Sequence, residues 1–175
     1  MVVALWCKEM PMKLFFLTWR IQHYALSTNE NIKRRGVSTA PRCFCCANPQ
    51  METTEHLFFH GNWAKNLWGS IGSRVNIICR GESFQEMIEN WFCLPGASDT
   101  ERKSQAVIVA AIYWILWEVM NKEREGSSLS ARLLYVRTRA LVLELGQLIR
   151  GSEDSFTLLF FFWFSSYCWP ALQNP

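Results

Sequence analysis

Residues 106–117, AVIVAAIYWILW, decide the fold of this 175-residue chain, because they form a run of twelve consecutive apolar residues. Three charged residues precede the run at positions 101–103, and three more follow it at positions 122–124. A membrane-spanning helix needs about 20 predominantly apolar residues. We therefore expect a helix buried in the core of a folded domain rather than one inserted in a membrane.

The overall composition agrees with a chain that has a real core. Half of the residues are hydrophobic, 19% are charged, and the aromatic residues comprise twelve Phe, nine Trp and four Tyr. This balance excludes a disordered chain. At about 150 residues per domain, the length predicts one domain, or one small module with a helical extension, and excludes a polymerase or a multidomain enzyme.

Three further stretches have the hydrophobic spacing of helices. Residues 11–21 (PMKLFFLTWRI) are apolar and aromatic and open with a proline, which suits a first helical turn. Residues 63–72 and 131–149 each place apolar side chains on one face. Residues 37–62 are expected to be irregular, and residues 79–104 loop-like around the short amphipathic stretch FQEMIENWF. The predicted fold class is mostly α, a small helical domain with an inserted Cys/His zinc-knuckle loop.

A short basic helix is expected between residues 27 and 36. Ser27 is the expected N-cap, with Glu30 three residues later, and Gly36 suits the position just after the helix. Residues 1–50 carry seven Lys and Arg against two Glu, so the positive charge of the chain gathers here. The basic residues either complement the negative end of the helix or contact phosphate groups; they are Lys33, Arg34, Arg35 and, further along, Arg42.

Two cysteines and two histidines have the spacing of a zinc site. Cys43 and Cys46 are separated by two residues, so one tight turn can direct both thiolates at a single ion. Nine residues then precede His56, and His60 lies one helical turn further on. Two sulfur and two nitrogen ligands suit tetrahedral Zn²⁺, although nine residues is shorter than the usual separation of about twelve in zinc fingers. One structural zinc ion is expected on these four residues.

The number of cysteines bears on the cellular compartment. Seven is odd, and Cys43, Cys45 and Cys46 fall within four residues, a poor spacing for a set of structural disulfides. The N-terminus carries no positive charge ahead of its short apolar run, unlike a secretory signal peptide. We therefore expect an intracellular protein, nuclear or cytoplasmic, that is not secreted.

The segments around the Cys/His cluster carry a family resemblance. PMKLFFLTWRI, LSTNENIKRRG, CFCC and ETTEHLFFHGNWAKNLW follow one another within residues 5 to about 70. In this order and spacing they resemble the zinc-binding domain of reverse transcriptases encoded by plant LINE-type, non-LTR retrotransposons. The pattern of that family has an aromatic helix ending in Trp-Arg, a basic ending with Gly, Cys-Pro-Leu-Cys, Glu-Thr-x-x-His-Leu-Phe, a further Cys, and a helix closing on Leu-Trp.

The resemblance implies that Cys43, Cys46 and His56 are the first three zinc ligands. The fourth ligand of the family is a cysteine five positions after the histidine, and here that position is Gly61. The site therefore either takes another fourth ligand or is weakened or lost. The candidates for the fourth ligand are His60, Cys45, Cys79, Cys93 and a water molecule.

A second, weaker resemblance covers residues 105 to 125, which include the motif YWILWEVMNKER. They are similar to the apolar helix that follows the zinc module in the plant elements on the way to an RNase H domain, with Met120 where that family has arginine. The expected organisation is a reverse transcriptase zinc-binding-like domain (1–75), a linker (76–104), a helical extension (105–150) and an unassigned apolar aromatic tail (151–175).

The sequence argues against an enzyme. A nucleophilic site built from Cys45 and a histidine lacks a third, orienting group. Glu52 and Glu55 are expected to be surface residues, or partners that orient a ligating histidine. No glycine-rich phosphate loop is present in the sequence. We therefore expect no catalytic activity and no small-molecule substrate.

Two non-catalytic functions remain. In the first, a zinc-folded module binds the backbone of RNA or DNA without sequence specificity through the four basic residues, while Phe44 and Trp63 stack on bases or pack over the zinc site. In the second, the chain is a decayed retroelement remnant that acts, if at all, as a hydrophobic protein-interaction fragment without bound metal.

Overall fold

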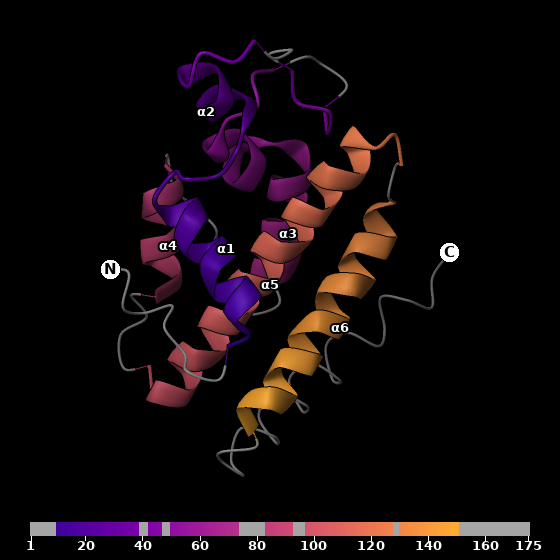
Figure 1. Cartoon of the computed structure of the whole chain (residues 1–175). Helices are drawn as coiled ribbons and strands as arrows, with labels where there is room; N and C mark the ends of the chain where they lie inside the picture. The colour runs from indigo at the N-terminus through magenta and orange to yellow at the C-terminus, as the bar shows by residue number, and fades with distance from the viewer. Residues whose placement is uncertain are drawn as a thin grey trace.

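The computed structural model describes residues 10–38, 42–46, 50–73, 83–92, 97–127 and 130–150. The regular elements in these ranges are all helical, with no strand among them, as Figure 1 shows. They are α1 (Met12–Gln22), α2 (Asn29–Arg34), the π-helical turn η2 (His56–His60), α3 (Asn62–Gly72), α4 (Phe84–Phe92), α5 (Asp99–Arg124) and α6 (Ala131–Arg150). The predicted mostly-α fold class is confirmed.

Helix α5 is the centre of the fold. It begins with a capping box, in which Ser98 Oγ accepts the Glu101 N–H at 3.2 Å and the Glu101 carboxylate accepts the Ser98 N–H at 2.7 Å. Ten of the twelve residues at positions 106–117 are buried. The helix is long and apolar enough to cross a membrane by length and composition, but 72% of its most apolar window is buried inside the fold. The predicted core helix is therefore confirmed.

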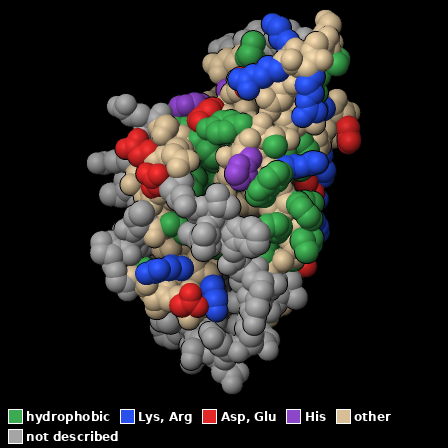
Figure 2. Space-filling model, turned by 60° about the vertical axis from the view of Figure 1, so that its left-hand side comes forward, with side chains coloured by type: hydrophobic (Ala, Val, Ile, Leu, Met, Phe, Trp, Pro, Cys, Tyr) green, Lys and Arg blue, Asp and Glu red, His purple; other side chains and the backbone are tan. Residues whose placement is uncertain are grey.

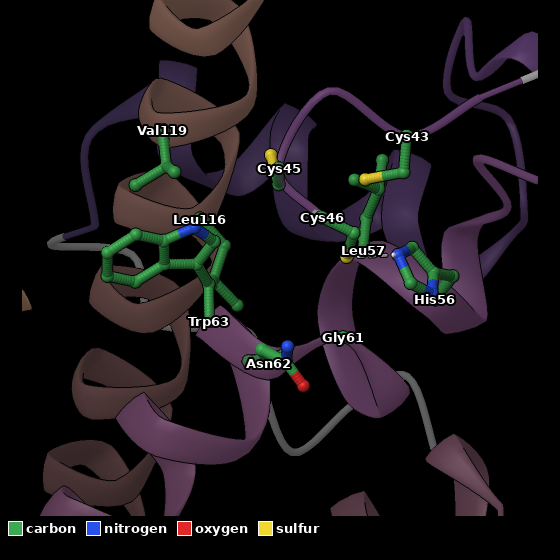
Figure 3. A pocket seen from close by; sticks show the side chains of 11 residues that line it. Cys43, Cys45, Cys46, His56, Leu57, Gly61, Asn62, Trp63, Leu116 and Val119 are labelled. Carbon is green, nitrogen blue, oxygen red and sulfur yellow. Dashed lines mark hydrogen bonds between the residues drawn. The ribbon is translucent and has the colours of Figure 1, made fainter. Parts of the chain in front are cut away.

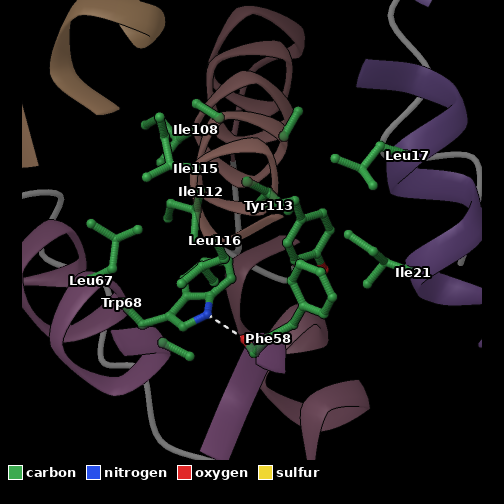
Figure 4. Close-up of a cluster of buried hydrophobic side chains, with 14 of the residues drawn as sticks. Leu17, Ile21, Phe58, Leu67, Trp68, Ile108, Ile112, Tyr113, Ile115 and Leu116 are labelled. Carbon is green, nitrogen blue, oxygen red and sulfur yellow. Dashed lines mark hydrogen bonds between the residues drawn. The ribbon is translucent and has the colours of Figure 1, made fainter. Parts of the chain in front are cut away.

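The other elements pack around α5. Helices α1, α3, α4 and α6 and the turn η2 all contact it, and Figure 1 shows α5 running between α1 and α6. The Tyr113 ring of α5 meets the Phe58 ring of η2 edge to face, with centroids 5.7 Å apart. The Trp68 ring of α3 meets the Trp91 ring of α4 in the same way at 5.3 Å. The Trp68 indole N–H donates to the Phe58 carbonyl at 2.8 Å, a bond drawn in Figure 4. This bond holds η2 against α3.

Helix α2 has the expected end and a different start. Gly36 adopts φ +82°, its N–H donates to the Lys33 carbonyl at 2.9 Å, and the Val37 N–H donates to the Ile32 carbonyl at 3.3 Å. This is a Schellman ending, which needs the left-handed conformation that glycine adopts without strain. The expected N-cap Ser27 is wrong by one residue, because the Thr28 hydroxyl accepts the Asn31 N–H at 3.3 Å.

Two stretches expected to be irregular contain helix. Residues 54–60, inside the expected irregular stretch 37–62, form a helical turn that continues as η2. Helix α4 lies inside the expected loop-like stretch 79–104, because its apolar residues recur every three or four positions and four of them are buried: Phe84, Met87, Ile88 and Trp91. The predicted linker thus contributes to the core, while the four-part division of the chain stays a prediction. The expected tail 151–175 lies outside the described residues.

Candidate metal centre

Three of the four predicted zinc ligands come together. One ligand atom from each of Cys43, Cys46 and His56 lies within 4.8 Å of the others. Cys46 Sγ is 3.2 Å from His56 Nε2, and Figure 3 shows the three side chains facing one another. Cys43 and His56 are buried and Cys46 is half-buried. Two sulfurs and one imidazole nitrogen at this spacing are donors that Zn²⁺ prefers.

Local backbone bonds position the three side chains. The Cys43 N–H donates to the Gln50 carbonyl at 2.6 Å, which closes the loop that carries both cysteines. The His56 N–H donates to the Thr53 hydroxyl at 2.9 Å, so the histidine opens η2 in a fixed orientation. The metal-binding atoms therefore come from a closed loop and a capped turn, both of which pack near α5.

The thiols of the cluster do not ionise alike. Hydrogen bonds that Cys43 accepts from the Cys45 thiol and from His56 lower the pKa of Cys43 to about 4, although its burial acts in the opposite direction. The hydrogen bond to Cys43 and burial raise the pKa of Cys45, and burial and the Cys43 charge raise that of Cys46. The lowered pKa favours the thiolate form of Cys43, the form that binds metal, and metal binding would release a proton from Cys46.

The π-helical turn brings position 61 next to the three predicted ligands. A π-helix bonds each carbonyl to the N–H five residues on, instead of four, and the Gly61 N–H donates to the His56 carbonyl at 2.7 Å. Position 61 therefore returns next to His56, and Gly61 lines the same pocket as Cys43 and Cys46 (Figure 3). Glycine supplies no ligand atom there. This matches the fourth-ligand position that the sequence resemblance implies.

His60 is not brought to the other three residues. Its side chain is 50% exposed, and its Nε2 lies 3.9 Å from a Glu55 carboxylate oxygen. The turn between His56 and His60 is π-helical rather than the expected ordinary helical turn, and His60 lies outside the group formed by the other three residues.

The remaining candidates for a fourth ligand differ in position. Cys45 lines the same pocket, whereas Cys79 and Cys93 lie outside the described residues. Trp63 is half-buried and also lines this pocket, which fits packing over the site rather than base stacking. Leu116 and Val119 of α5 form the apolar side of the pocket.

The predicted nucleic-acid-binding residues are all exposed, and one of them, Arg42, directly precedes the predicted ligand Cys43. Lys33, Arg34 and Arg35 end α2, and Arg34 forms an ion pair with Glu30 at 2.9 Å. Arg42 lies over the Phe44 ring, 5.1 Å from its centroid. One of the four cations is thus paired locally, and contact of these residues with phosphate stays a prediction.

Glu52 forms a buried ion pair that the sequence did not predict. The expectation of a surface residue is wrong, because this carboxylate is completely buried, pairs with Arg124 of α5, and accepts the Asn29 N–H at the start of α2 at 3.2 Å. Its burial raises its pKa although Arg124 opposes this. Seventy-two positions separate the two partners, so no local pattern could have paired them.

A known protein family matches the part of the chain that contains the Cys/His cluster. Residues 2–68 match the family model described as zinc-binding in reverse transcriptase. The match includes Cys43, Cys46, His56 and Gly61, and it supports a reverse transcriptase zinc-binding domain, an accessory rather than a catalytic part of that enzyme. The plant, LINE-type assignment stays a prediction. No curated protein and no solved structure matches the chain.

Proposed function

We propose that this chain is a non-catalytic, zinc-dependent nucleic-acid-binding module derived from a retrotransposon reverse transcriptase polyprotein. The observation that carries the proposal is the convergence of Cys43, Cys46 and His56 within the segment that matches the zinc-binding family. A nuclear or cytoplasmic location in the cell belongs to the same proposal.

In this proposal the metal has a structural role. Cys43, Cys46 and His56 would hold one Zn²⁺, which would cross-link the cysteine loop to the η2 turn. The loop also leads into Arg42, whose carbonyl accepts the Asn29 side-chain N–H at 3.2 Å. Fixing the loop therefore fixes Arg42 beside α2, the helix that presents the other three cations to a phosphate backbone.

The second candidate function is a retroelement remnant without bound metal. The specific observation that favours it is Gly61, which occupies the fourth-ligand position without a donor atom. A remnant would associate, if at all, through apolar surface, and its interactions would not weaken as salt rises.

The first test is zinc affinity and stoichiometry of the full chain, measured by chelator competition and elemental analysis. A Cβ at position 61 would lie 2.6 Å from the His56 carbonyl oxygen, so any side chain there requires a shift of the turn. Gly61→Ala is therefore the matched control for Gly61→Cys, since both carry the Cβ and only one carries a thiol.

We expect one zinc per chain in the parent protein, loss of zinc in Cys46→Ser, and tighter binding in Gly61→Cys than in Gly61→Ala. Equal affinity of the two position-61 variants would refute the assignment of this position to the metal. Absence of zinc from the parent, with binding restored in Gly61→Cys, would instead favour the remnant.

The second test is nucleic-acid binding as a function of salt. Because phosphate contacts release counterions, affinity should fall steeply between about 50 and 200 mM salt. Replacing Lys33, Arg34 and Arg35 with glutamine should weaken binding and flatten this dependence. Binding that ignores both the salt and the triple substitution would contradict the proposal.

A further inference from the structure

We propose that the outer face of α1 binds unpaired, single-stranded nucleic acid by stacking bases on Phe16 and Trp19. This inference rests on the proposed function and specifies its substrate class. We call this surface the α1 outer face and define it by Met12, Phe16, Trp19, Arg20 and His23.

Helix α1 is apolar on two sides. Its inner side buries Leu14, Leu17 and Ile21 in the core, whereas Met12, Phe16 and Trp19 are 65%, 54% and 41% exposed. With His23, the exposed residues follow one another at intervals of four, three and four, the spacing of one helix face. The core does not use these side chains, and a row of exposed large apolar residues marks an interaction site.

The rings on this face are ordered by their neighbours. Trp19 packs against the His23 ring with centroids 4.8 Å apart, and Phe16 meets Phe15 edge to face at 5.6 Å. Trp19 lies three positions after Phe16, about 4.5 Å along the helix axis. Two neighbouring unpaired bases can therefore each find an aromatic surface, which is how single strands are commonly bound.

The charge of the helix favours a polyanion. Residues 12–22 include Lys13 and Arg20 but no Asp or Glu. Lys13 lies over the Trp114 ring at 4.8 Å, whereas Arg20 is exposed and forms no ion pair with any described residue. Arg20 directly follows Trp19, so a phosphate beside a stacked base would have a cation within reach.

The face also continues toward the basic end of α2. In Figure 2 a group of Lys and Arg side chains gathers at the top of the molecule, where Figure 1 places α2, and hydrophobic side chains lie below it on the same side. Tyr24 is not part of the face, because its hydroxyl donates to Glu55 at 2.6 Å. A strand could thus meet the predicted phosphate-binding residues and the stacking rings together.

A single strand fits better than a duplex. Binding of the phosphate backbone alone would not require the exposed rings of Phe16 and Trp19. The bases of a duplex are already stacked on one another and leave no free face for these rings. Only unpaired bases offer a free face to Phe16 and Trp19.

The test compares binding of labelled oligo-dT and oligo-U single strands with binding of a duplex of the same length, using the zinc-loaded full chain. Phe16→Ala and Trp19→Ala should each weaken single-strand binding about 5- to 150-fold, the range for the loss of one stacked base. Duplex binding should stay within about twofold, and Trp19→Phe should retain most of the single-strand affinity.

Two controls accompany these variants. Val136→Ala removes an apolar side chain that is 45% exposed on α6 and should change nothing. Arg20→Gln should lower the salt slope for single strands by about 0.7, as expected for one lost phosphate contact. Unchanged melting temperatures would show that the exposed substitutions leave the fold intact.

The outcomes separate the two proposals. If single strands and duplexes bind equally and Phe16→Ala and Trp19→Ala have no effect, the inference fails while nucleic-acid binding through α2 stands. If no nucleic acid binds at all, the proposed function fails as well. If the same variants instead abolish self-association in sedimentation experiments and leave single-strand binding intact, the face is a dimer interface and the inference is overturned.

Discussion

Replacing Arg124 with methionine tests whether the Glu52–Arg124 pair holds the Cys/His loop against α5. Glu52 is completely buried and its second oxygen has no hydrogen-bond partner among the described residues. Arg124 lies in the last turn of α5, with a side chain 28% exposed. The substitution keeps most of the side-chain volume and removes the charge, so it leaves a buried carboxylate with only the Asn29 N–H.

The expected cost follows from this burial. Removing one partner of a buried ion pair costs about 3–5 kcal/mol. Because Arg124 is partly exposed and one hydrogen bond to Glu52 remains, we expect the lower end, about 3 kcal/mol at neutral pH. With an m-value of about 2 kcal/mol/M, this would shift the midpoint of urea unfolding by about 1.5 M.

The pH dependence has a definite sign. Burial raises the pKa of Glu52 above its value in the unfolded chain, and Arg124 opposes this rise, so the variant should raise the pKa further. A raised pKa gives stability that is fully present below the unfolded pKa and is lost as pH rises through the folded pKa. The deficit of Arg124→Met relative to the parent should therefore be larger at neutral pH than in mildly acidic solution.

The assay is urea unfolding of the parent, Arg124→Met, Glu52→Gln and the double variant, at neutral and at mildly acidic pH. Because the four proteins are compared at the same pH, the contribution of zinc binding to the free energy of unfolding is common to all of them and cancels. Glu52→Gln should recover part of the loss in the double variant, because it removes the unpaired charge. A deficit below about 0.5 kcal/mol, or one that is equal at both pH values, would refute the role assigned to this pair.

Three further predictions concern the core, the cluster and α2. A chain ending at Ser98 lacks α5 with its thirteen buried residues and should show no cooperative unfolding transition by circular dichroism; a sharp transition would mean that the preceding residues fold alone. Cys45→Ala removes the thiol that donates a hydrogen bond to the Cys43 thiolate, so alkylation of Cys43 in the metal-free protein should shift to higher pH, and an unchanged profile would contradict that hydrogen bond. Thr28→Ala should cost about 1 kcal/mol and Ser27→Ala almost nothing, and the reverse order in thermal unfolding would restore Ser27 as the N-cap.

Much of the fold could be predicted because its signals are local. The apolar run at 106–117 exceeds what one helix face requires, so burial on nearly all sides was the direct interpretation. The place of Gly36 after three basic residues predicts the position just after a helix, and its φ of +82° confirms this prediction. The sequence of α4 predicts an amphipathic stretch but not a core element, because its packing against α5 depends on residues far away in the chain.

The candidate site was predicted in part for a similar reason. Cys43, Cys46 and His56 follow from ligand chemistry and chain spacing, and the structure brings them together. The choice between His60 and Gly61 depends on whether the turn after His56 is α or π, which residue spacing alone does not reveal. The Glu52–Arg124 pair joins distant positions and could not be predicted from either residue's neighbours.

The ion pair between Glu52 and Arg124 also has a consequence for how the protein is made. The segment that matches the zinc-binding family ends at residue 68, and 56 further residues must be synthesised before Arg124 exists. At about 5–20 residues per second, the ribosome needs about 3–11 s for this stretch. During that interval the nascent chain carries three closely spaced thiols and a carboxylate without its guanidinium partner. Synthesis of α5 therefore sets the earliest time at which the buried Glu52 carboxylate can gain its partner Arg124.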